Sequence, residues 1–308
     1  MQRRKFIKGS LAAGAGGVIA LKGGNTHLLA ATADKSRSAK YDLVGVKGGE
    51  PAEMFDRGIA ELGGMRAFLK RGQSVVVKPN IGWARPPEAA ANTNPQLVQR
   101  IVEHCYKAGA SVVYIFDHTC NSWRDCYEKS GMNKVATATR AKLVTGNHSN
   151  DYRDVDVSKG VKLKKAKMHR LILDSDVFIN VPVLKNHGGA VMTCAMKNLM
   201  GIVWDRGYFH RHDLQQCIAD FVTVRPPDLN IIDGYRVMKK GGPRGHSLHD
   251  VEMMKYQMLS RDIVAIDTAA SKVIGIDTDR IPHIHHAQEL GLGTMDLKSI
   301  KIKRIKMS

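Results

Sequence analysis

The chain has 308 residues, of which 47 are Lys or Arg and 29 are Asp or Glu, giving a formal net charge of +18. Hydrophobic residues make up 43% and recur throughout, which excludes a disordered, collagen-like or coiled-coil protein. Five cysteines without any C-x-x-C spacing exclude a disulfide-dense scaffold, a zinc ribbon and the usual ferredoxin cluster. The composition therefore indicates a soluble globular protein.

The first 33 residues have the features of an export signal. Arg3-Arg4 precedes a weakly hydrophobic, Gly/Ala-rich run over 11–21. This run is too short to span a bilayer, which takes about 20 residues, and the small-x-small triplet that ends at Ala33 is typical of a signal-peptidase site. We therefore predict a twin-arginine (Tat) signal peptide cleaved near Ala33, transport by the Tat export machinery, and a periplasmic mature protein.

The charge of the mature chain points to an anionic partner. Removal of residues 1–33 takes away five basic residues and no acidic ones, which leaves a formal charge of +13. An exported protein meets little nucleic acid, and the sequence has no motif of nucleic-acid recognition. We therefore expect a small anionic molecule or the membrane surface as the partner, and no nucleic acid.

Strands and helices alternate along residues 34–308, which we predict to form one domain. Short apolar runs predict strands over 75–77, 112–116, 177–181 and 229–232. Helical periodicity and capping residues predict helices over 52–70, 95–108, 191–200, 214–222 and 262–274. Strand, helix and strand with short joints predict an α/β fold, with an open, largely parallel sheet and helices on both of its faces.

Polar side chains follow the predicted strands, at the carboxyl end of the sheet where α/β proteins hold their ligands. They are Lys78 and Asn80, Asp117 and His118, Lys185, Asn186 and His187, and Asp233. A further Lys-Asn pair occurs at Lys197-Asn198. Lysine supplies a positive charge and Asn supplies donor and acceptor groups, which suit a carboxylate, a phosphate or a polarised carbonyl. Any one of them could instead pair with a carboxylate or cap a turn; three Lys-Asn groups at equivalent places favour function.

Several segments resemble the signature segments of the DUF362 family, in the expected order and across nearly the whole mature chain. They are the segments over 77–80, 181–187, 197–201, 232–234, 241–243 and 262–267, followed by Ile274-Gly275. The family is defined by sequence and has no general activity assigned to it. Many relatives carry a ferredoxin-like cysteine segment, so the resemblance implies a redox link and a redox partner protein. The cysteines of this chain depart from that pattern, so we do not expect an intrinsic iron–sulfur cluster.

The cysteines leave two further questions open. Cys120 and Cys126 lie six residues apart in a Trp-containing loop, and a periplasmic pair could form a disulfide. Cys194 lies between two Lys-Asn pairs, where it is either a nucleophile or, more simply, a small buried helix residue.

Two groups of histidines could bind a metal ion. His210 and His212, with Asp205, offer nitrogen and oxygen ligands close to Lys197 in the sequence. His283 and His286 belong to a predicted surface helix, where they either bind a metal or face solvent.

Two functions follow from these residues. In the first, the protein is an enzyme that acts on an anionic or carbonyl-bearing small molecule, by redox-linked or acid–base chemistry. The predicted catalytic residues are Lys78, Lys185, His187 and Lys197, with His187 moving protons. The predicted ligand-binding residues are Asn80, Asn186, Asn198, Asp117, Asp233, Gly241 and Gly242. In the alternative, it is a periplasmic protein that binds or delivers a metal or an anion without chemistry. The convergence of Lys, His and carboxylate groups favours the enzyme.

Overall fold

Ten strands form one sheet in the computed structural model, which describes residues 40–308. In chain order they are β1 (Leu43–Lys47), β2 (Ser74–Pro79), β3 (Val112–Asp117), β4 (Lys142–Thr145), β7 (Val177–Val181), β8 (Val183–His187), β9 (Val191–Thr193), β10 (Leu229–Met238), β11 (Val251–Ser260) and β12 (Ile302–Lys306). The order across the sheet is β12-β1-β11-β10-β7-β2-β3-β4, and β8 pairs with β10 and β9. The predicted signal peptide and its cleavage site lie outside the described residues.

The sheet is largely parallel, as the sequence predicts. Strands β10, β7, β2, β3 and β4 run parallel to their neighbours in this series. Strand β11 is antiparallel to both β1 and β10, and β9 is antiparallel to β8. Because β2, β3 and β7 run the same way, their carboxyl ends lie at one edge of the sheet.

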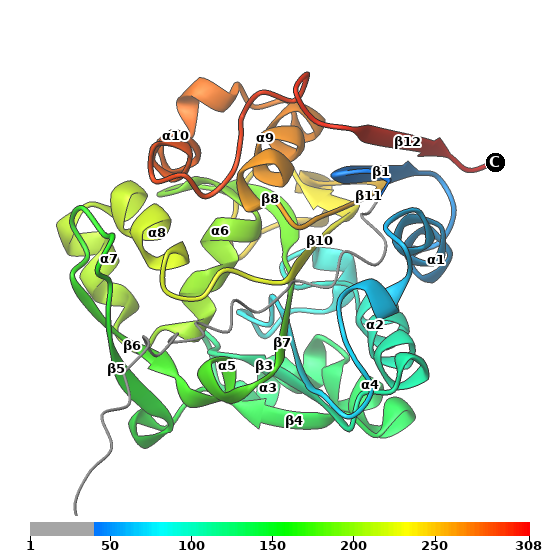
Figure 1. Cartoon of the computed structure of the whole chain (residues 1–308), viewed down its shortest axis with the longest axis horizontal. Coiled ribbons are helices and arrows are strands. Elements are labelled where there is room, and N and C mark those ends of the chain that lie inside the picture. The colour runs from blue at the N-terminus through cyan, green and yellow to red at the C-terminus, as the bar shows by residue number, and fades with distance from the viewer. Residues whose placement is uncertain (1–39) are drawn as a thin grey trace, which may run out of the picture. The chain divides into compact units, whose positions relative to one another are not determined.

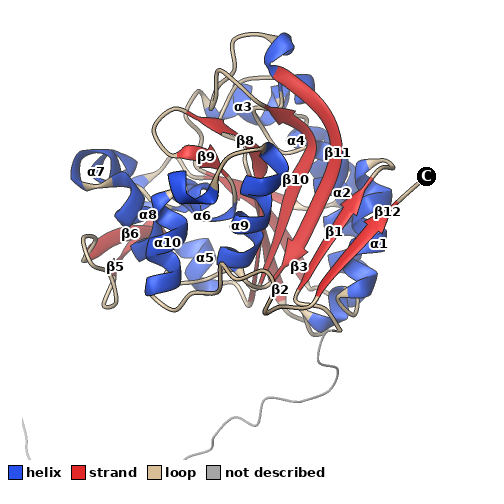
Figure 2. Ribbon diagram, turned by 90° about the horizontal axis from the view of Figure 1, so that it is seen from above, coloured by secondary structure: helices blue, strands red, loops and turns tan. Residues whose placement is uncertain are grey.

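Helices cover both faces of the sheet, which confirms the predicted α/β fold (Figures 1 and 2). One face carries α1 (Pro51–Glu61), α2 (Pro95–Ala108) and α4 (Met132–Thr139), and the other carries α6 (Ala195–Asn198), α8 (Leu214–Val222), α9 (Ile263–Ile274) and α10 (Pro282–Glu289). Successive side chains of a strand point to opposite faces. Val75 and Val77 of β2 accordingly pack in the core beneath α1 and α2, and Val76 packs in the core on the other side.

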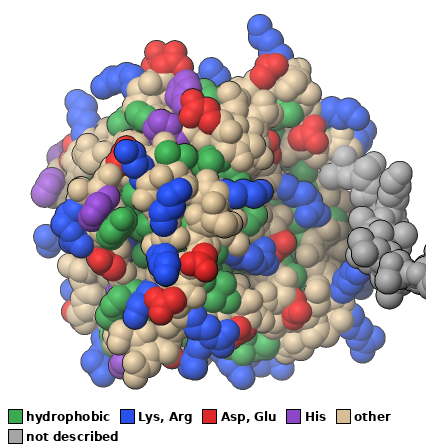
Figure 3. Space-filling view, turned by 60° about the vertical axis from the view of Figure 1, so that its left-hand side comes forward, with side chains coloured by type: hydrophobic (Ala, Val, Ile, Leu, Met, Phe, Trp, Pro, Cys, Tyr) green, Lys and Arg blue, Asp and Glu red, His purple; other side chains and the backbone are tan. Residues whose placement is uncertain are grey.

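Three further helices and a two-stranded antiparallel pair add to this arrangement. They are α3 (Trp123–Lys129), α5 (Arg170–Asp174), α7 (Arg206–His212) and the antiparallel pair of β5 (Tyr152–Asp156) and β6 (Lys165–His169). None of the helices within residues 40–308 combines the length and apolar character needed to cross a membrane. Lys and Arg side chains are spread across the face of the molecule in Figure 3, where acidic side chains are fewer.

Local capping signals define the helices that were predicted most closely. The Asn94 side chain accepts a hydrogen bond from Gln96 N at the start of α2, and Gly109 ends that helix with φ of 105°. The Asp262 side chain accepts hydrogen bonds from Val264 N and Ala265 N at the start of α9. Such caps pair backbone groups that a helix end leaves without partners.

Three predicted elements have different bounds in the structure. The predicted helix over 191–200 is wrong at its start, because residues 191–193 form β9 against β8 and α6 begins only at Ala195. The helix predicted over 52–70 ends at Glu61, ahead of two glycines with positive φ. The strand predicted over 229–232 continues to Met238, because β11 pairs with it along its length.

The structure bears on three of the open questions, which concern Cys194, the pair of Cys120 and Cys126, and His283. Cys194 is buried, as the simpler interpretation predicts, but it lies just before α6 rather than within a helix, and burial raises the pKa of its thiol well above the usual range. Cys120 and Cys126 are separate thiols in the structure, the first exposed and the second buried. His283 does not face solvent, because α10 packs against α8, and its Nδ1 donates to Gln215 Oε1 at 2.6 Å.

Candidate functional site

A cavity of about 270 Å³ lies at the carboxyl ends of β2, β3 and β8. Four residues that the sequence predicts to be catalytic, Lys78, Lys185, His187 and Lys197, all line it. The rest of its wall is formed by Asn80, Gly82, Trp83, Asp117, His118, Cys120, Thr193, Asn198, Met200, Gly201, Arg206, His210 and Pro243. Six of the eight polar residues predicted at strand ends therefore line one cavity.

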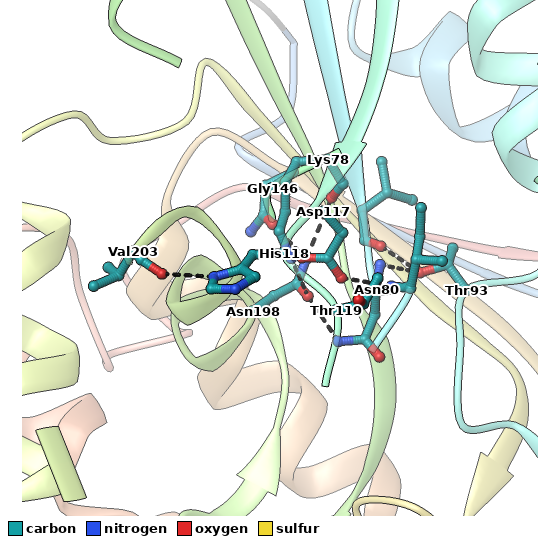
Figure 4. Close-up of polar contacts among 12 residues, drawn as sticks. Lys78, Asn80, Thr93, Asp117, His118, Thr119, Gly146, Asn198 and Val203 are labelled. Atoms are coloured by element: carbon teal, nitrogen blue, oxygen red, sulfur yellow. Dashed lines mark hydrogen bonds and ion pairs between the residues drawn. The ribbon is translucent and has the colours of Figure 1, made fainter. Parts of the chain in front are cut away.

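A buried ion pair forms part of the wall of this cavity. Lys78 Nζ lies 2.9 Å from Asp117 Oδ1, and both side chains are almost fully buried (Figure 4). Asp117 Oδ2 accepts a hydrogen bond from Ile81 N at 2.6 Å. Burial lowers the pKa of Lys78, and the adjacent carboxylate opposes that shift. The negative charge of Asp117 is thus already matched by the protein.

Asn198 links this ion pair to the neighbouring strands. Its Oδ1 accepts from Lys78 Nζ at 2.9 Å and from Asn80 Nδ2 at 3.1 Å, while its Nδ2 donates to Asn180 Oδ1 at 2.8 Å. Asn180 in turn donates to Asn230 Oδ1 and to the Ala195 carbonyl. A buried network with all of its groups paired holds its members in one arrangement. Asn80, Asn198 and Lys78 are therefore fixed before any ligand arrives.

Lys185 is buried, and its amine donates hydrogen bonds to acceptors within the protein. Its Nζ donates to Asn80 Oδ1 at 3.1 Å and to the Ala91 carbonyl. Burial lowers the pKa of Lys185 to about 7. Burial therefore shifts this amine toward its uncharged form near neutral pH.

Lys197 differs from the other two lysines in having no hydrogen-bond or ion-pair partner among the described residues. It extends from α6, one residue before the fixed Asn198. Desolvation lowers the pKa of Lys197 to about 8, so a sizeable share of its amines is uncharged at mildly alkaline pH.

Arg206 adds a further positive charge to the cavity wall and is not among the site residues predicted from the sequence. Its Nη1 and Nη2 donate to the carbonyls of His118 and Thr119, each at 2.9 Å, and Nη1 also lies 3.4 Å from Cys120 Sγ. These contacts tie α7 to the loop after β3. They join segments more than eighty residues apart, so no local sequence signal could have revealed them.

His187 is fixed as a hydrogen-bond donor. Its Nδ1 accepts from Gly189 N and Ala190 N, each at 3.1 Å, so the ring proton sits on Nε2. Burial and the nearby Lys197 lower the pKa of His187 to about 3, so the ring is neutral at pH 7. Nε2–H can donate to a ligand oxygen, whereas the neutral ring has no free lone pair with which to accept a proton.

His118 has the opposite tautomer. Its Nδ1 lies 3.0 Å from the Val203 carbonyl, which can only accept, so the proton is on Nδ1 and Nε2 carries a lone pair (Figure 4). The ring stacks on Trp204 with 5.4 Å between centroids. Burial lowers the pKa of His118, which keeps the ring neutral. The cavity therefore holds one histidine that can accept a proton and one that can donate a hydrogen bond.

Four of the predicted ligand-binding residues do not line the cavity. Asp233 is buried beside α2, where it accepts from Asn94 N at 2.7 Å, and burial raises its pKa to about 6. Asn186 Oδ1 accepts from Gly242 N at 3.3 Å. A Cβ on Gly242 would lie 1.8 Å from the Asn186 carbonyl oxygen, so this glycine permits close backbone packing. Gly241, the residue before it, adopts positive φ. These residues therefore serve backbone packing beside the cavity rather than forming its wall.

The predicted metal ligands are not brought together. His210 lines the cavity, but His212 stacks on Tyr208 at 3.8 Å between ring centroids. Asp205 caps α7 by accepting from Tyr208 N at 3.1 Å. Within residues 40–308 no three His, Cys, Asp or Glu side chains are arranged to hold a metal ion. The groups that line this cavity include amines, a guanidinium, amides and imidazoles, with Asp117 as the single carboxylate and Cys120 as a thiol. The excess of hydrogen-bond donors and positive charge suits an anion.

Comparison with known proteins gives matches that span most of the chain. Residues 75–272 match the family model described as a domain of unknown function (DUF362). The thylakoid-associated protein sll1697 of Synechocystis sp. is 27% identical over 239 residues, which cover 75% of this chain and 72% of that protein.

Two solved structures are similar at much lower identity. A protein from Thermotoga maritima gives a TM-score of 0.48 at 11% identity, over 75% of this chain and 60% of the other. The lactate racemase apoprotein from Thermoanaerobacterium thermosaccharolyticum gives a TM-score of 0.43 at 13% identity, over 69% and 53% of the two chains. This chain spans less than two thirds of either solved chain. Because the family model matches more than half of its 308 residues, the chain belongs to the DUF362 family.

Proposed function

We propose that the protein is an enzyme that binds a small anionic, carbonyl-bearing molecule in the cavity beside Lys197 and moves a proton on it. The observation that carries this proposal is the charge balance of the cavity. Three lysines and Arg206 line it with a single carboxylate, Asp117, which Lys78 already neutralises. Cationic groups with little water around them attract an anion far more strongly than they would in bulk solvent.

Acid–base chemistry is supported by the two cavity histidines. His118 presents the lone pair of Nε2 and His187 presents an Nε2–H group. A base that takes a proton from the carbon next to a carbonyl needs a donor that stabilises the enolate oxygen. His118 as base and His187 as donor supply this combination, in contrast to the assignment of His187 as the proton carrier. Lys185 and Lys197 add positive charge where negative charge develops.

Binding and turnover are tested separately. Calorimetric titration with pyruvate, lactate, acetate and inorganic phosphate measures anion binding, and ¹H NMR of pyruvate in D₂O measures exchange at its methyl group. We expect binding by the wild type, at least tenfold weaker binding by Lys197→Met, and no change for the exposed surface variant Lys159→Met. His118→Gln should bind but lose exchange. Binding by the wild type without turnover of any carbonyl acid would support the non-catalytic binding protein, and no binding of any anion would refute both.

The export route is a separate part of the proposal. We propose that residues 1–33 direct the chain through the Tat machinery to the periplasm, on the basis of Arg3-Arg4 and the triplet that ends at Ala33. N-terminal sequencing of protein from the periplasmic fraction should begin at Asp34. The double variant Arg3→Lys/Arg4→Lys should remain in the cytoplasm, and periplasmic accumulation of this variant would contradict the Tat route.

A further inference from the structure

The three lysines of the cavity differ in what their amines are free to do. Lys78 is held by Asp117 and Asn198, and Lys185 is held by Asn80 and the Ala91 carbonyl. Lys197 has no such partner within residues 40–308, although its side chain faces the same cavity. An uncharged amine that is not used as a hydrogen-bond donor to the protein is available as a nucleophile.

Arg206 could bind the carboxylate of a ligand that lies beside Lys197. A guanidinium has five N–H donors, of which the contacts to His118, Thr119 and Cys120 use three. Nε–H and one N–H of Nη2 remain, which belong to the two nitrogens that form the side-on fork of a guanidinium, and the three contacts hold the group in place. Such a fork matches the two oxygens of a carboxylate.

We propose that Lys197 forms an imine with the carbonyl carbon of a 2-oxo acid whose carboxylate is bound by Arg206. This inference rests on the proposed function and names its substrate class. A 2-oxo acid places its carboxylate and its carbonyl on adjacent carbons, and Lys197 and Arg206 both line the cavity that would hold it. A phosphate or a plain carboxylate could satisfy Arg206 and would leave the free amine unused.

The step balances without any further reactant. The lone pair of the neutral Lys197 Nζ attacks the carbonyl carbon, and the π electrons move onto the oxygen, which takes up a proton. The resulting carbinolamine loses that oxygen as water, so that amine and ketone become imine and water. Nζ gives up two protons in all, and both leave in the water molecule. His187 lines the same cavity with its proton on Nε2, and in this proposal it donates a hydrogen bond to the oxygen while that atom carries negative charge.

Reductive trapping tests the proposal on the full mature chain. The protein is incubated at pH 8 with pyruvate and sodium cyanoborohydride, then digested and analysed by peptide mass spectrometry. We expect one reduced pyruvate unit on Lys197, with acetone giving at least tenfold less labelling because it has no carboxylate. Lys197→Arg keeps the charge and should lose the label, Arg206→Lys should reduce it, and Lys159→Met should label like the wild type.

A second measurement distinguishes failure of the imine from failure of the proposed anion-binding function. Calorimetric titration with lactate, which has the carboxylate but no carbonyl, is run on the same samples. Lactate binding without a trapped adduct would overturn the imine and leave the anion-binding enzyme standing. A label on Lys185, or scattered over exposed lysines, would also overturn the assignment to Lys197. Absence of both lactate binding and labelling would refute the proposed function as well.

Discussion

Lys78 and Asp117 form an ion pair in which both side chains are buried, with 2.9 Å between Nζ and Oδ1. Removing one member of such a pair leaves a buried charge without compensation, which costs about 3–5 kcal/mol. We expect Asp117→Asn to lower the free energy of unfolding by about this amount, as measured by urea denaturation. The double variant Lys78→Met/Asp117→Asn should be more stable than the sum of the two single changes predicts. Additive single effects would show that the two charges do not interact.

The ion pair also depends on the absence of a side chain at position 201. A Cβ on Gly201 would lie 2.0 Å from Asp117 Oδ1 and 2.5 Å from Lys78 Nζ, which is closer than the atoms can approach. We expect Gly201→Ala to separate the pair, to cost about 1–3 kcal/mol of stability and to abolish anion binding. Gly188→Ala is the control, because a Cβ there meets no atom within 4 Å. Equal behaviour of the two variants would contradict the steric argument.

Lys185 and Lys197 should make the free energy of unfolding increase with pH in the alkaline range. The pKa of Lys185 is about 7 in the folded protein and about 10.4 in an unfolded chain. Between these values the unfolded chain binds more protons, so the free energy of unfolding increases from pH 7 towards pH 10. Lys197, with its pKa at about 8, contributes with the same sign. Denaturation at a series of pH values should show a smaller rise for Lys185→Met than for the wild type, and parallel curves would contradict the shift.

The same titrations predict the opposite trend for ligand binding. An anion interacts with the protonated amines, so its affinity should fall as the pH rises through about 7 and 8, the pKa values of Lys185 and Lys197. Lactate titrations between pH 6 and pH 9 measure this directly. Lys185→Met should remove the lower of the two transitions and keep the upper. An affinity that stays constant over the range would show that neither amine faces the ligand.

The two cavity histidines are expected to differ in tautomer. Long-range ¹H–¹⁵N NMR spectra at pH 7 should show a protonated Nε2 for His187 and a protonated Nδ1 for His118, because their hydrogen bonds require it. His187→Gln and His118→Gln serve to assign the signals. A shared tautomer would remove the basis for assigning one histidine as base and the other as donor.

Asp267 positions Lys197 from a distance in the sequence. Its carboxylate accepts hydrogen bonds from Ala195 N at 2.7 Å and Met196 N at 3.0 Å, at the start of the helix that carries Lys197. We expect Asp267→Ala to cost about 1–2 kcal/mol and to weaken lactate binding although it touches no ligand. Ala269→Ser is the control. Ala269 lies on α9, as Asp267 does, and is partly exposed, so this variant should leave lactate binding unchanged. Unaltered binding by Asp267→Ala would show that α6 keeps its position without this cap.

The sequence predicted those features that depend on nearby residues. The bounds of α2 follow from Asn94, Pro95 and Gly109, and the strand ends at Lys78 and Asp117 follow from short apolar runs. Because parallel strands present their carboxyl ends at one edge, the meeting of Lys78, Asp117 and Lys185 around one cavity could also be anticipated, whereas Lys197 reaches it from α6.

Features that depend on distant partners could not be predicted. The start of α6 is set by Asp267, which lies 72 residues away from Ala195. Asp233 follows the strand predicted over 229–232, yet in the structure it lies within β10 and accepts a hydrogen bond from Asn94 N, so it does not line the cavity. The tautomers of the histidines likewise depend on carbonyl and amide groups that only the folded chain brings to them.

The concentration of positive charge around Lys197 offers a way to search for the natural ligand without knowing the reaction. Mutual repulsion among the amines and the guanidinium raises the free energy of the folded state, and an anion seated between them relieves it. Binding to the folded state alone raises the melting temperature in proportion to the logarithm of the ligand concentration. A library of metabolites can therefore be ranked by thermal shift, and compounds that stabilise the wild type but not Lys197→Met identify the chemistry to which this cavity is matched.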